Sequence, residues 1–474
     1  MNARPRTRSI AVAVAACLVV ALAGACRKSQ APAPGSSVQT QDRFKWNLKT
    51  LVEPYEKAGY ANRAWDEPAK RALTEFARAR GQVTGTNEPW AQIIATNSAL
   101  AVKAGCTDPM MAYLFTRFSL DQTSSSKVFA DALSNAAREM EKSSYPHIRK
   151  FYASLRAAEQ LKSVAGTTNT PPEVHQFRRS ASTQLAAALG DASMPIGEVD
   201  DACQDLFKAV QQNDRQYEEF YRRIERRLFR NWPRESACWL LKGQFYVQYA
   251  WAARGGDYAN TVTEEGWKLF GERLVEAESA LAQAWTLNPK DPRIAIEMMA
   301  VELGQGRGRD VMELWFQRAM ELDPNNYDAC NAKMLYLEPK WYGSVEEMIV
   351  FGRECAHSKK WGGYVPLMLA DAHDAAAGYL AEADRPAYWT SPEVWPDIKA
   401  AFEKFFWLNP NVIGRHHNYA RYAYRCEQWD ELNEQLAQLG PVNYGYFGGK
   451  EAFEKMVRLA KEHTATGAKT AETN

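Results

Sequence analysis

Apolar residues recur at helical spacing along most of the chain, and the strict alternation typical of strands is almost absent. The segment from Glu198 to Phe229 is the clearest case, with intervals of three and four. Such intervals place the residues on one side of a helix and leave the other sides polar. The pattern predicts an all-α protein. The stripe comprises Val199, Cys203, Leu206, Val210, Asn213, Tyr217, Phe220, Ile224 and Leu228.

We predict that segment 198–229 is one continuous helix, roughly 48 Å long at 1.5 Å per residue. A coiled-coil dimerisation arm is one interpretation of such a helix. The stripe covers little more than four heptads and encodes no choice of partner, which favours instead a helix packed along the N-terminal half.

Capping residues and prolines mark the beginnings of many medium-length helices, since proline is tolerated in a first turn and a preceding Asp or Ser satisfies free backbone N–H groups. Many such helices joined by short turns are typical of an α-solenoid. The predicted starts include Asp108-Pro109, Asp291-Pro292, Ser391-Pro392, Thr261 with Glu264, and Ser344 with Glu347.

Shifts in composition predict five segments. Residues 43–230 form a helical N-terminal region and residues 231–461 a repeat region, whereas the small and polar residues 462–474 are expected to be disordered. Before them stand a signal peptide, 1–25, and a flexible tether, 26–42, whose Pro, Ser and Gln residues cannot pack a core.

The repeat region contains a recurring set of spacings. Three segments carry bulky or small apolar residues at intervals of 4, 3 and 5, and they end in the similar words TLNP, ELDP and WLNP; another segment follows the W-x₂-x-G-x₂-Y pattern. These segments resemble the helices and closing turn of the tetratricopeptide repeat. The matching residues are Trp239, Gly243 and Tyr246; Ala277, Leu281, Ala284 and Pro289; Met312, Phe316, Ala319 and Pro324; and Ile398, Phe402, Phe405 and Pro410.

The resemblance implies an α-α superhelix in which a small residue lets two helices approach and proline ends the second. The chain departs from the pattern in two places: Lys242 replaces the usual leucine, and 86 residues separate Pro324 from Pro410. The chain also resembles a family of bacterial repeat-containing lipoproteins over about residues 231–440. That resemblance implies a fold but no activity.

The N-terminus resembles the export signal of a bacterial lipoprotein. Three arginines precede a run of sixteen uncharged residues, 10–25, which is shorter than the roughly 20 residues that span a bilayer. The word LAGAC, ending at Cys26, resembles a lipobox, whose cysteine is lipidated. Ala23 stands where a lipobox usually has leucine, so plain secretion is the alternative. The resemblance implies a membrane-anchored lipoprotein of the cell envelope, on its periplasmic or outer-membrane face.

Composition and charge are those of a folded protein without a nucleic-acid partner. The chain is 46% hydrophobic and 24% charged, with a net charge of +1, and loss of residues 1–25 would make it −2. Binding to nucleic acid needs a basic stripe that neutralises phosphates, and the sequence contains none.

The sequence contains no catalytic signature, and we predict neither an enzyme nor a cofactor; an enzyme of unrecognised type is the lesser alternative. HExxH, GxSxG and P-loop motifs are absent, and the glycines from Gly304 to Gly308 follow a helix rather than a strand. The words Asp371-x-His373-Asp374 and Cys355-x-His357 lack the spacing that puts two ligands on one helical face, so no metal site is expected. We expect His416 and His417, at the head of a helix, to be solvent-exposed.

Six cysteines follow Cys26, widely spaced and without a CxxC pair. A zinc site is therefore not expected, and most of these thiols fall within helical patterns, where they act as small buried hydrophobes. If a disulfide exists, Cys330–Cys355 is the pair to test, because the two residues lie on consecutive predicted helices.

Two aromatic turns could contact a ligand: Trp341-Tyr342 and Trp361 with Tyr364. Flat rings beside glycines can stack on a sugar or grip a peptide, or they can simply seal a helical hairpin. The leading hypothesis is a lipid-anchored scaffold that binds a protein or peptide partner in a solenoid groove. The alternative is a lipoprotein that binds a glycan or peptide through these turns.

Overall fold

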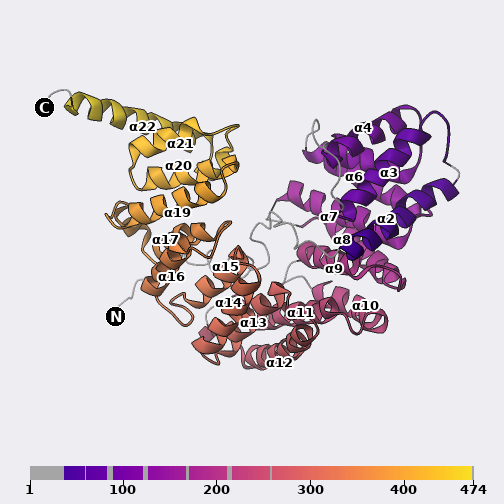
Figure 1. Cartoon of the computed structure of the whole chain (residues 1–474), viewed down its shortest axis with the longest axis horizontal. Coiled ribbons are helices and arrows are strands. Elements are labelled where there is room, and N and C mark those ends of the chain that lie inside the picture. The colour runs from indigo at the N-terminus through magenta and orange to yellow at the C-terminus, as the bar shows by residue number, and fades with distance from the viewer. Residues whose placement is uncertain are drawn as a thin grey trace, which may run out of the picture. The chain divides into compact units, whose positions relative to one another are not determined.

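The computed structural model describes residues 37–58, 60–82, 89–120, 126–166, 170–210, 216–256 and 259–471. Within these ranges all regular secondary structure is helical, so the predicted all-α class is confirmed (Figure 1). No described helix combines the length and apolar character needed to cross a membrane. Cys26 and the predicted signal peptide lie outside the described residues.

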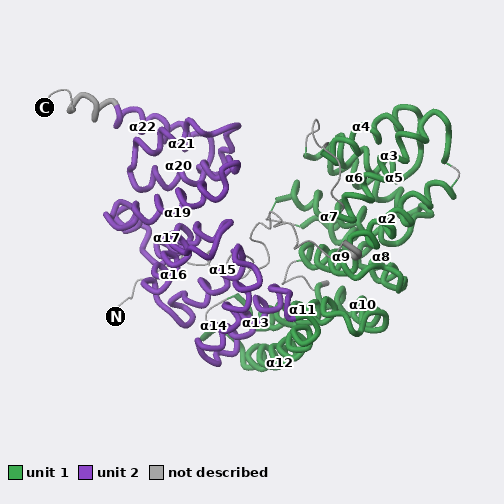
Figure 2. Tube along the Cα trace, in the orientation of Figure 1, with its two compact units in different colours: residues 1–288 green, residues 289–474 purple. Residues whose placement is uncertain are grey.

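The chain forms two compact units, residues 1–288 and 289–474 (Figure 2). The boundary that the sequence suggested, between residues 230 and 231, falls inside unit 1, in the last turn of helix α10. The first predicted repeat hairpin therefore belongs to the same compact unit as the N-terminal helices.

Unit 1 contains eleven described α-helices, a π-helical turn and a 3₁₀ turn. They are α2 (Ser37–Lys57), α3 (Asp66–Arg80), α4 (Trp90–Lys103), α5 (Pro109–Phe115), η1 (Thr116–Leu120), α6 (Ser126–Lys142), α7 (His147–Ala165), α8 (Pro172–Ala188), α9 (Ile196–Ala209), α10 (Gln216–Asn231), α11 (Ser236–Arg254), η2 (Ala259–Thr261) and α12 (Glu264–Leu287).

Apart from the 22-residue α22, the helices of unit 2 have 15 residues or fewer, and several 3₁₀ turns connect them. They are α13 (Pro292–Gln305), α14 (Arg309–Leu322), α15 (Tyr327–Tyr336), α16 (Val345–His357), η3 (Val365–Leu367), α17 (Met368–Gly378), η4 (Glu382–Asp384), α18 (Arg385–Trp389), α19 (Val394–Leu408), η5 (Ile413–Arg415), α20 (His416–Arg425), α21 (Trp429–Ala437), η6 (Tyr444–Phe447) and α22 (Lys450–Ala471).

Helices in both units pack mainly on their neighbours in sequence. In unit 1 the most extensive pairings are α11 with α12, α7 with α8, α6 with α7, and α3 with α4; in unit 2 they are α13 with α14, α16 with α17, and α20 with α21. Such local pairing buries the apolar stripe of each helix against the next, as in α-solenoids. The paired-helix arrangement predicted from the sequence is confirmed.

The N-terminal helices depart from this local pattern, because α2 also packs on α9. The contact is made by a buried ionic network. Glu198 of α9 is fully buried and accepts hydrogen bonds from Arg43 of α2 (2.8 Å) and Arg80 of α3 (2.7 Å). Burial would raise the pKa of Glu198, but the charges of Arg80, Arg43 and Arg149 outweigh it and lower that pKa to about 2.

The single long helix predicted over 198–229 is wrong. The chain forms two helices, α9 and α10, and Val210 leaves the helical conformation with φ −103° and ψ 127°. The apolar stripe itself is real, since Leu206 and Phe220 are both buried. The break lets α9 pack on α7 and α11 while α10 packs on α8 and α11, so both halves of the stripe are covered.

The first predicted repeat hairpin, α11 with α12, is held together by a close approach at a glycine. A Cβ placed on Gly243 would lie 2.5 Å from Cγ of Leu281, so only glycine fits there. Ala277, Leu281 and Ala284 are fully buried on the facing side of α12. The expected reason for the spacing, a small residue that admits the partner helix, is confirmed at this hairpin.

The other repeat residues are also buried where their spacing requires. Met312, Phe316 and Ala319 line α14, and Ile398, Phe402 and Phe405 line α19. Each closing proline follows the end of its helix by two residues: Pro289 follows α12, Pro324 follows α14 and Pro410 follows α19.

Three of the predicted helix caps are confirmed and two are wrong. The side chains of Asp108, Asp291 and Ser344 accept backbone N–H groups in the first turns of α5, α13 and α16. Thr263, rather than Thr261, caps α12. Helix α19 begins at Val394, so Ser391-Pro392 lies in the preceding turn.

Both ends of the described chain are more helical than expected. Helix α2 begins at Ser37, inside the predicted tether 26–42, and α22 extends to Ala471, through most of the segment 462–474 that we expected to be disordered. His417 was expected to be exposed but is buried, and its Nε2 accepts the backbone N–H of Asn443 at 3.3 Å.

Candidate binding surface

A recess of about 530 Å³ opens on unit 1 where α10, α11 and α12 meet. Two tyrosines and two arginines dominate it, and the exposed Val275 stands in its α12 wall. We call this recess the tyrosine–arginine groove. Its lining residues are Arg222, Tyr246, Tyr249, Leu269, Glu272, Arg273, Val275 and Glu276.

Tyr249 and Arg273 form one side of the groove as a fixed pair. The guanidinium carbon of Arg273 lies 3.3 Å from the centre of the Tyr249 ring, and its Nη1 donates to the Tyr249 carbonyl oxygen at 2.7 Å. The Tyr249 hydroxyl donates to Glu218 at 2.7 Å. Burial, followed by this hydrogen bond to Glu218, raises the pKa of Tyr249.

Tyr246 and Arg222 form the other side. Nη1 of Arg222 donates to the Tyr246 hydroxyl at 3.3 Å and to Glu225 at 3.1 Å. Lys242, one turn before Tyr246, places its ammonium 5.7 Å from the Tyr246 ring centre and pairs with Glu276 at 3.7 Å. Cations and carboxylates are thus balanced around both rings.

Buried aromatic rings support the groove from below. Phe245 is fully buried, and the rings of Tyr221 and Tyr249 stack on it at 3.9 and 5.2 Å between centroids. Helix α11 therefore carries Phe245 inward and its neighbours Tyr246 and Tyr249 outward to the groove. The rings have little rotational freedom, which reduces the entropy lost when they bind a partner.

A second polar cluster lies on the C-terminal helices of unit 2. Asp371 of α17 accepts a hydrogen bond from Tyr327 of α15, and Asp374, one turn later, accepts from Tyr422 and, at 2.6 Å, from Arg425 of α20. Burial raises the pKa of Asp371 to about 6. The cluster links three helices across the face of α17.

His373, between these aspartates, points into a separate set of contacts. Its ring nitrogens lie 2.8 Å from the Tyr388 hydroxyl and 3.1 Å from Asp397, which also accepts from Arg353 at 2.9 Å. Burial lowers the pKa of His373. The described residues contain no group of three or more His, Cys, Asp or Glu side chains arranged to hold a metal.

The four aromatic residues proposed as ligand contacts lie in two turns: Trp341 and Tyr342 between α15 and α16, and Trp361 and Tyr364 between α16 and η3. The Trp361 ring packs edge-on against the Phe316 ring, with 5.7 Å between centroids. The Tyr364 ring packs at a tilt on the Phe405 ring, with 5.0 Å between centroids. Tyr342 packs on Tyr336 and donates to the Leu303 carbonyl at 3.2 Å, yet 44% of its surface stays exposed. Trp341 is half-buried. These contacts seal helix ends, and a ligand role remains a prediction.

The six cysteines after Cys26 are free in this structure, and all are buried, as their positions in helical patterns predicted for most of them. The thiols of Cys330 and Cys355 are in hydrogen-bond contact between α15 and α16. The pair singled out from the sequence is therefore a spatial pair, in the reduced form.

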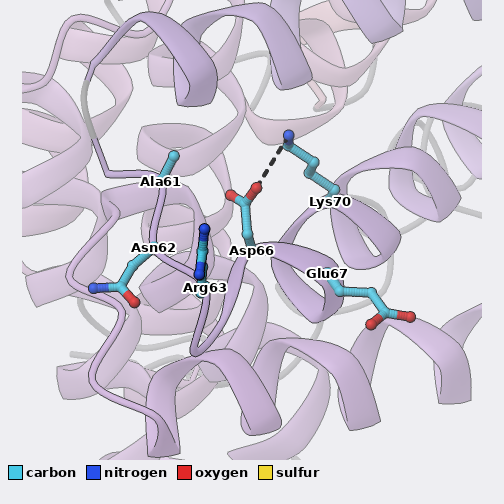
Figure 3. Close-up of a pocket in the computed structure, with 6 residues that line it drawn as sticks. All are labelled: Ala61, Asn62, Arg63, Asp66, Glu67 and Lys70. Carbon is cyan, nitrogen blue, oxygen red and sulfur yellow. Dashed lines mark ion pairs between the residues drawn. The ribbon is translucent and has the colours of Figure 1, made fainter.

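A shallow depression of about 470 Å³ lies where the chain enters α3 (Figure 3). Asp66 and Lys70 point toward each other in an ion pair of 3.1 Å, while Glu67 points away from them. The Tyr55 hydroxyl also donates to Asp66 at 2.8 Å. The lining side chains do not converge on a common point, so we assign no function to this depression.

Sequence reasoning identified only one residue of the tyrosine–arginine groove, Tyr246, and gave it a structural role. Tyr249 was missed although it follows Tyr246 by three residues, a spacing that puts both on one helical face. Arg222 and Arg273 carry no sequence signal, because they reach the groove from other helices.

The sequence matches no protein-family model, and comparison with curated proteins finds none similar to it. The resemblance to tetratricopeptide repeats therefore depends on residue spacing in the sequence.

Proposed function

We propose that the protein is a tetratricopeptide-like scaffold that binds a segment of a partner protein in the tyrosine–arginine groove and catalyses no reaction. The observation that carries this proposal is the groove itself: two supported tyrosines and two arginines around an open recess on paired helices. Tyrosine and arginine are enriched among the residues that dominate protein-binding energy.

The balance of charge in the groove favours a protein segment over a nucleic acid. Arg222, Arg273 and Lys242 face Glu218, Glu225 and Glu276. A partner with mixed charges and apolar side chains can exchange these pairs for its own, whereas a phosphate backbone would meet as many carboxylates as cations.

We propose that the scaffold is exported and held in the cell envelope by a lipid on Cys26. The support is the signal-like N-terminus and its resemblance to a lipobox. The partner is then another envelope protein.

Site-specific photo-crosslinking tests the groove directly. A photoreactive amino acid replaces Val275, which is 60% exposed within the groove. A matched variant carries it at Val350 on α16, which is 63% exposed and lies in the other unit. We expect discrete adducts with an envelope protein from position 275 and none from position 350.

The specificity of the adduct is tested with Arg273→Ala in the Val275 crosslinking variant. Loss of Arg273 removes the stack on Tyr249, so we expect the adduct to weaken about tenfold or more, as for a hot-spot residue. Equal adducts at both positions, or an adduct insensitive to Arg273, would contradict the proposal.

A glycan or peptide ligand at the aromatic turns is the second candidate, and the exposed ring of Tyr342 is the observation that favours it. We expect Tyr342→Ala to abolish binding on a glycan array if this candidate is correct. Trp361→Ala is less informative, because its ring packs on Phe316 and its loss would disturb folding.

A further inference from the structure

Three sulfur atoms from three successive helices meet in the core of unit 2. Sγ of Cys330, on α15, lies 3.8 Å from Sδ of Met320, on α14, and its thiol is in hydrogen-bond contact with that of Cys355, on α16. Both cysteines are fully buried and free, and Met320 is 4% exposed. We call these three residues the sulfur cluster.

We propose that the sulfur cluster binds one soft monovalent metal ion, Cu(I), through two thiolates and one thioether. Thiolate and thioether sulfurs are the protein ligands that select Cu(I). With metal–sulfur bonds of about 2.3 Å, three sulfurs arranged in a plane around one ion stand about 4 Å apart. The 3.8 Å contact between Cys330 and Met320 is close to that separation, so these two donors need little movement.

The number and type of ligands in the sulfur cluster favour Cu(I) over zinc. Structural zinc sites are almost always four-coordinate. The described residues contain no arrangement of three or more His, Cys, Asp or Glu side chains fit for a metal, so the two cysteines lack the further ligands that zinc requires. A three-donor set that includes methionine suits the lower coordination number of Cu(I).

Binding must release protons, because the thiolates are the ligands. One Cu(I) and two thiols give a complex of charge −1 and two protons that pass to solvent. Lys333 supplies a nearby positive charge: it is 7% exposed and pairs with Glu313 at 2.8 Å. Burial raises the pKa of the Cys355 thiol well above its ordinary value, and the charge of Lys333 opposes that shift.

The surroundings of the cluster are apolar and aromatic. The ammonium of Lys333 lies 4.5 Å from the centre of the Phe316 ring and 4.6 Å from that of Phe351. Because all three residues of the sulfur cluster are buried, water has little access to the sulfurs, which protects a bound Cu(I) from exchange and oxidation. Met320, at 4% exposed, is the least buried of the three and marks the side from which an ion would enter.

Metal titration of the purified full chain tests the proposal. Cu(I) is added without oxygen in competition with a colorimetric Cu(I) chelator, and Ag(I) serves as an analogue that does not oxidise thiols. We expect one ion per chain, release of about two protons, and an affinity that rises with pH. Zn(II) should not compete.

Two variants, one of them a double substitution, identify the ligands. We expect Cys330→Ala with Cys355→Ala to lower the affinity for Cu(I) by more than about 100-fold, beyond the 10- to 100-fold loss typical of outer-shell residues. Met320→Leu conserves volume and removes only the thioether, so a loss of about tenfold is expected with folding intact. Matched controls are Cys238→Ala and Met140→Leu, both buried in unit 1.

The proposal is overturned if the double cysteine variant binds Cu(I) as tightly as the natural chain, or if a control variant loses as much affinity. Formation of a Cys330–Cys355 disulfide in place of a bound ion overturns it too. Because the titration uses the isolated chain, its result is independent of whether the tyrosine–arginine groove binds a partner.

Discussion

Two acidic residues of this protein, Glu198 and Asp371, have pKa values shifted in opposite directions. Glu198 is stabilised as an anion by Arg43 and Arg80, whereas Asp371 is destabilised as an anion because burial outweighs its hydrogen bond from Tyr327. The opposite pKa shifts come from the neighbouring charges and not from the depth of burial. Glu198 exposes less surface than Asp371, yet its pKa is the one that is lowered. Each residue gives a separate test.

Glu198→Gln should destabilise the chain by about 3 kcal/mol, because it leaves buried arginines without their compensating charge. The Glu198 pKa is lowered to about 2, so its contribution is complete above the ordinary pKa of about 4.5 and is lost as pH falls from there to about 2. Urea unfolding at several pH values measures this. The free energy of unfolding of the variant should not show this decrease between about pH 4.5 and pH 2.

A matched control for Glu198 is Glu53→Gln, which breaks the exposed pair with Lys57 on α2. Exposed pairs contribute less than about 1 kcal/mol, so this variant should unfold at nearly the natural urea concentration. Equal losses in both variants would mean that the network around Glu198 does not hold α2 to α9.

Asp371→Asn should make unit 2 less dependent on pH between about 4 and 6. The folded-state pKa of Asp371 is raised to about 6, so the natural chain loses stability as pH rises through this window and the unfolded state ionises first. At pH 4 the two chains should have similar free energies of unfolding. At pH 7 we expect the free energy of unfolding of the variant to exceed that of the natural chain by about 1–2 kcal/mol. Thermal unfolding at the two pH values measures the gain.

The control for this variant is Asp310→Asn, which changes an exposed aspartate in the first turn of α14. Its pH profile should follow that of the natural chain. The Asp371 interpretation is wrong if the two variants have the same profile.

At the scale of elements, the repeat hairpin α11–α12 is where sequence and structure agree most closely. The spacing indicated that Gly243 and Leu281 belong to facing helices, and the structure brings them into contact. The same pattern reasoning failed over 198–229, because periodicity reports which side of a helix is apolar and not whether the helix bends. Only the packing of α9 and α10 on different neighbours determines the break.

Gly243→Ala should destabilise the protein by about 1–3 kcal/mol, since its Cβ would lie 2.5 Å from the Leu281 side chain and force α11 and α12 apart. Gly271→Ala on α12 is the matched control, because a Cβ there meets nothing within 4 Å. The control should gain up to about 1 kcal/mol from helix propensity. Chemical denaturation of the two variants should therefore give shifts of opposite sign.

At the scale of the whole molecule, the prediction of export to the cell envelope depends on the N-terminal sequence, which lies outside the described residues. Mass spectrometry of the native N-terminus tests it. We expect a mature chain that begins at Cys26 and carries acyl groups, because two or three acyl chains bind a bilayer stably. Cleavage at the same place without acylation would indicate plain secretion, and an intact Met1 would exclude export.

The amino-acid sequence alone determined the all-α class, the paired helices and the three buried repeat faces, because helical periodicity and capping are local properties that a chain carries wherever it packs. It did not determine the break after Ala209, the buried network at Glu198, the tyrosine–arginine groove or the sulfur cluster. Each of these depends on side chains far apart in sequence, such as Arg43 and Glu198, or Arg222 and Arg273. Their meeting depends on how the helices pack, so only the tertiary structure decides which residues share a site.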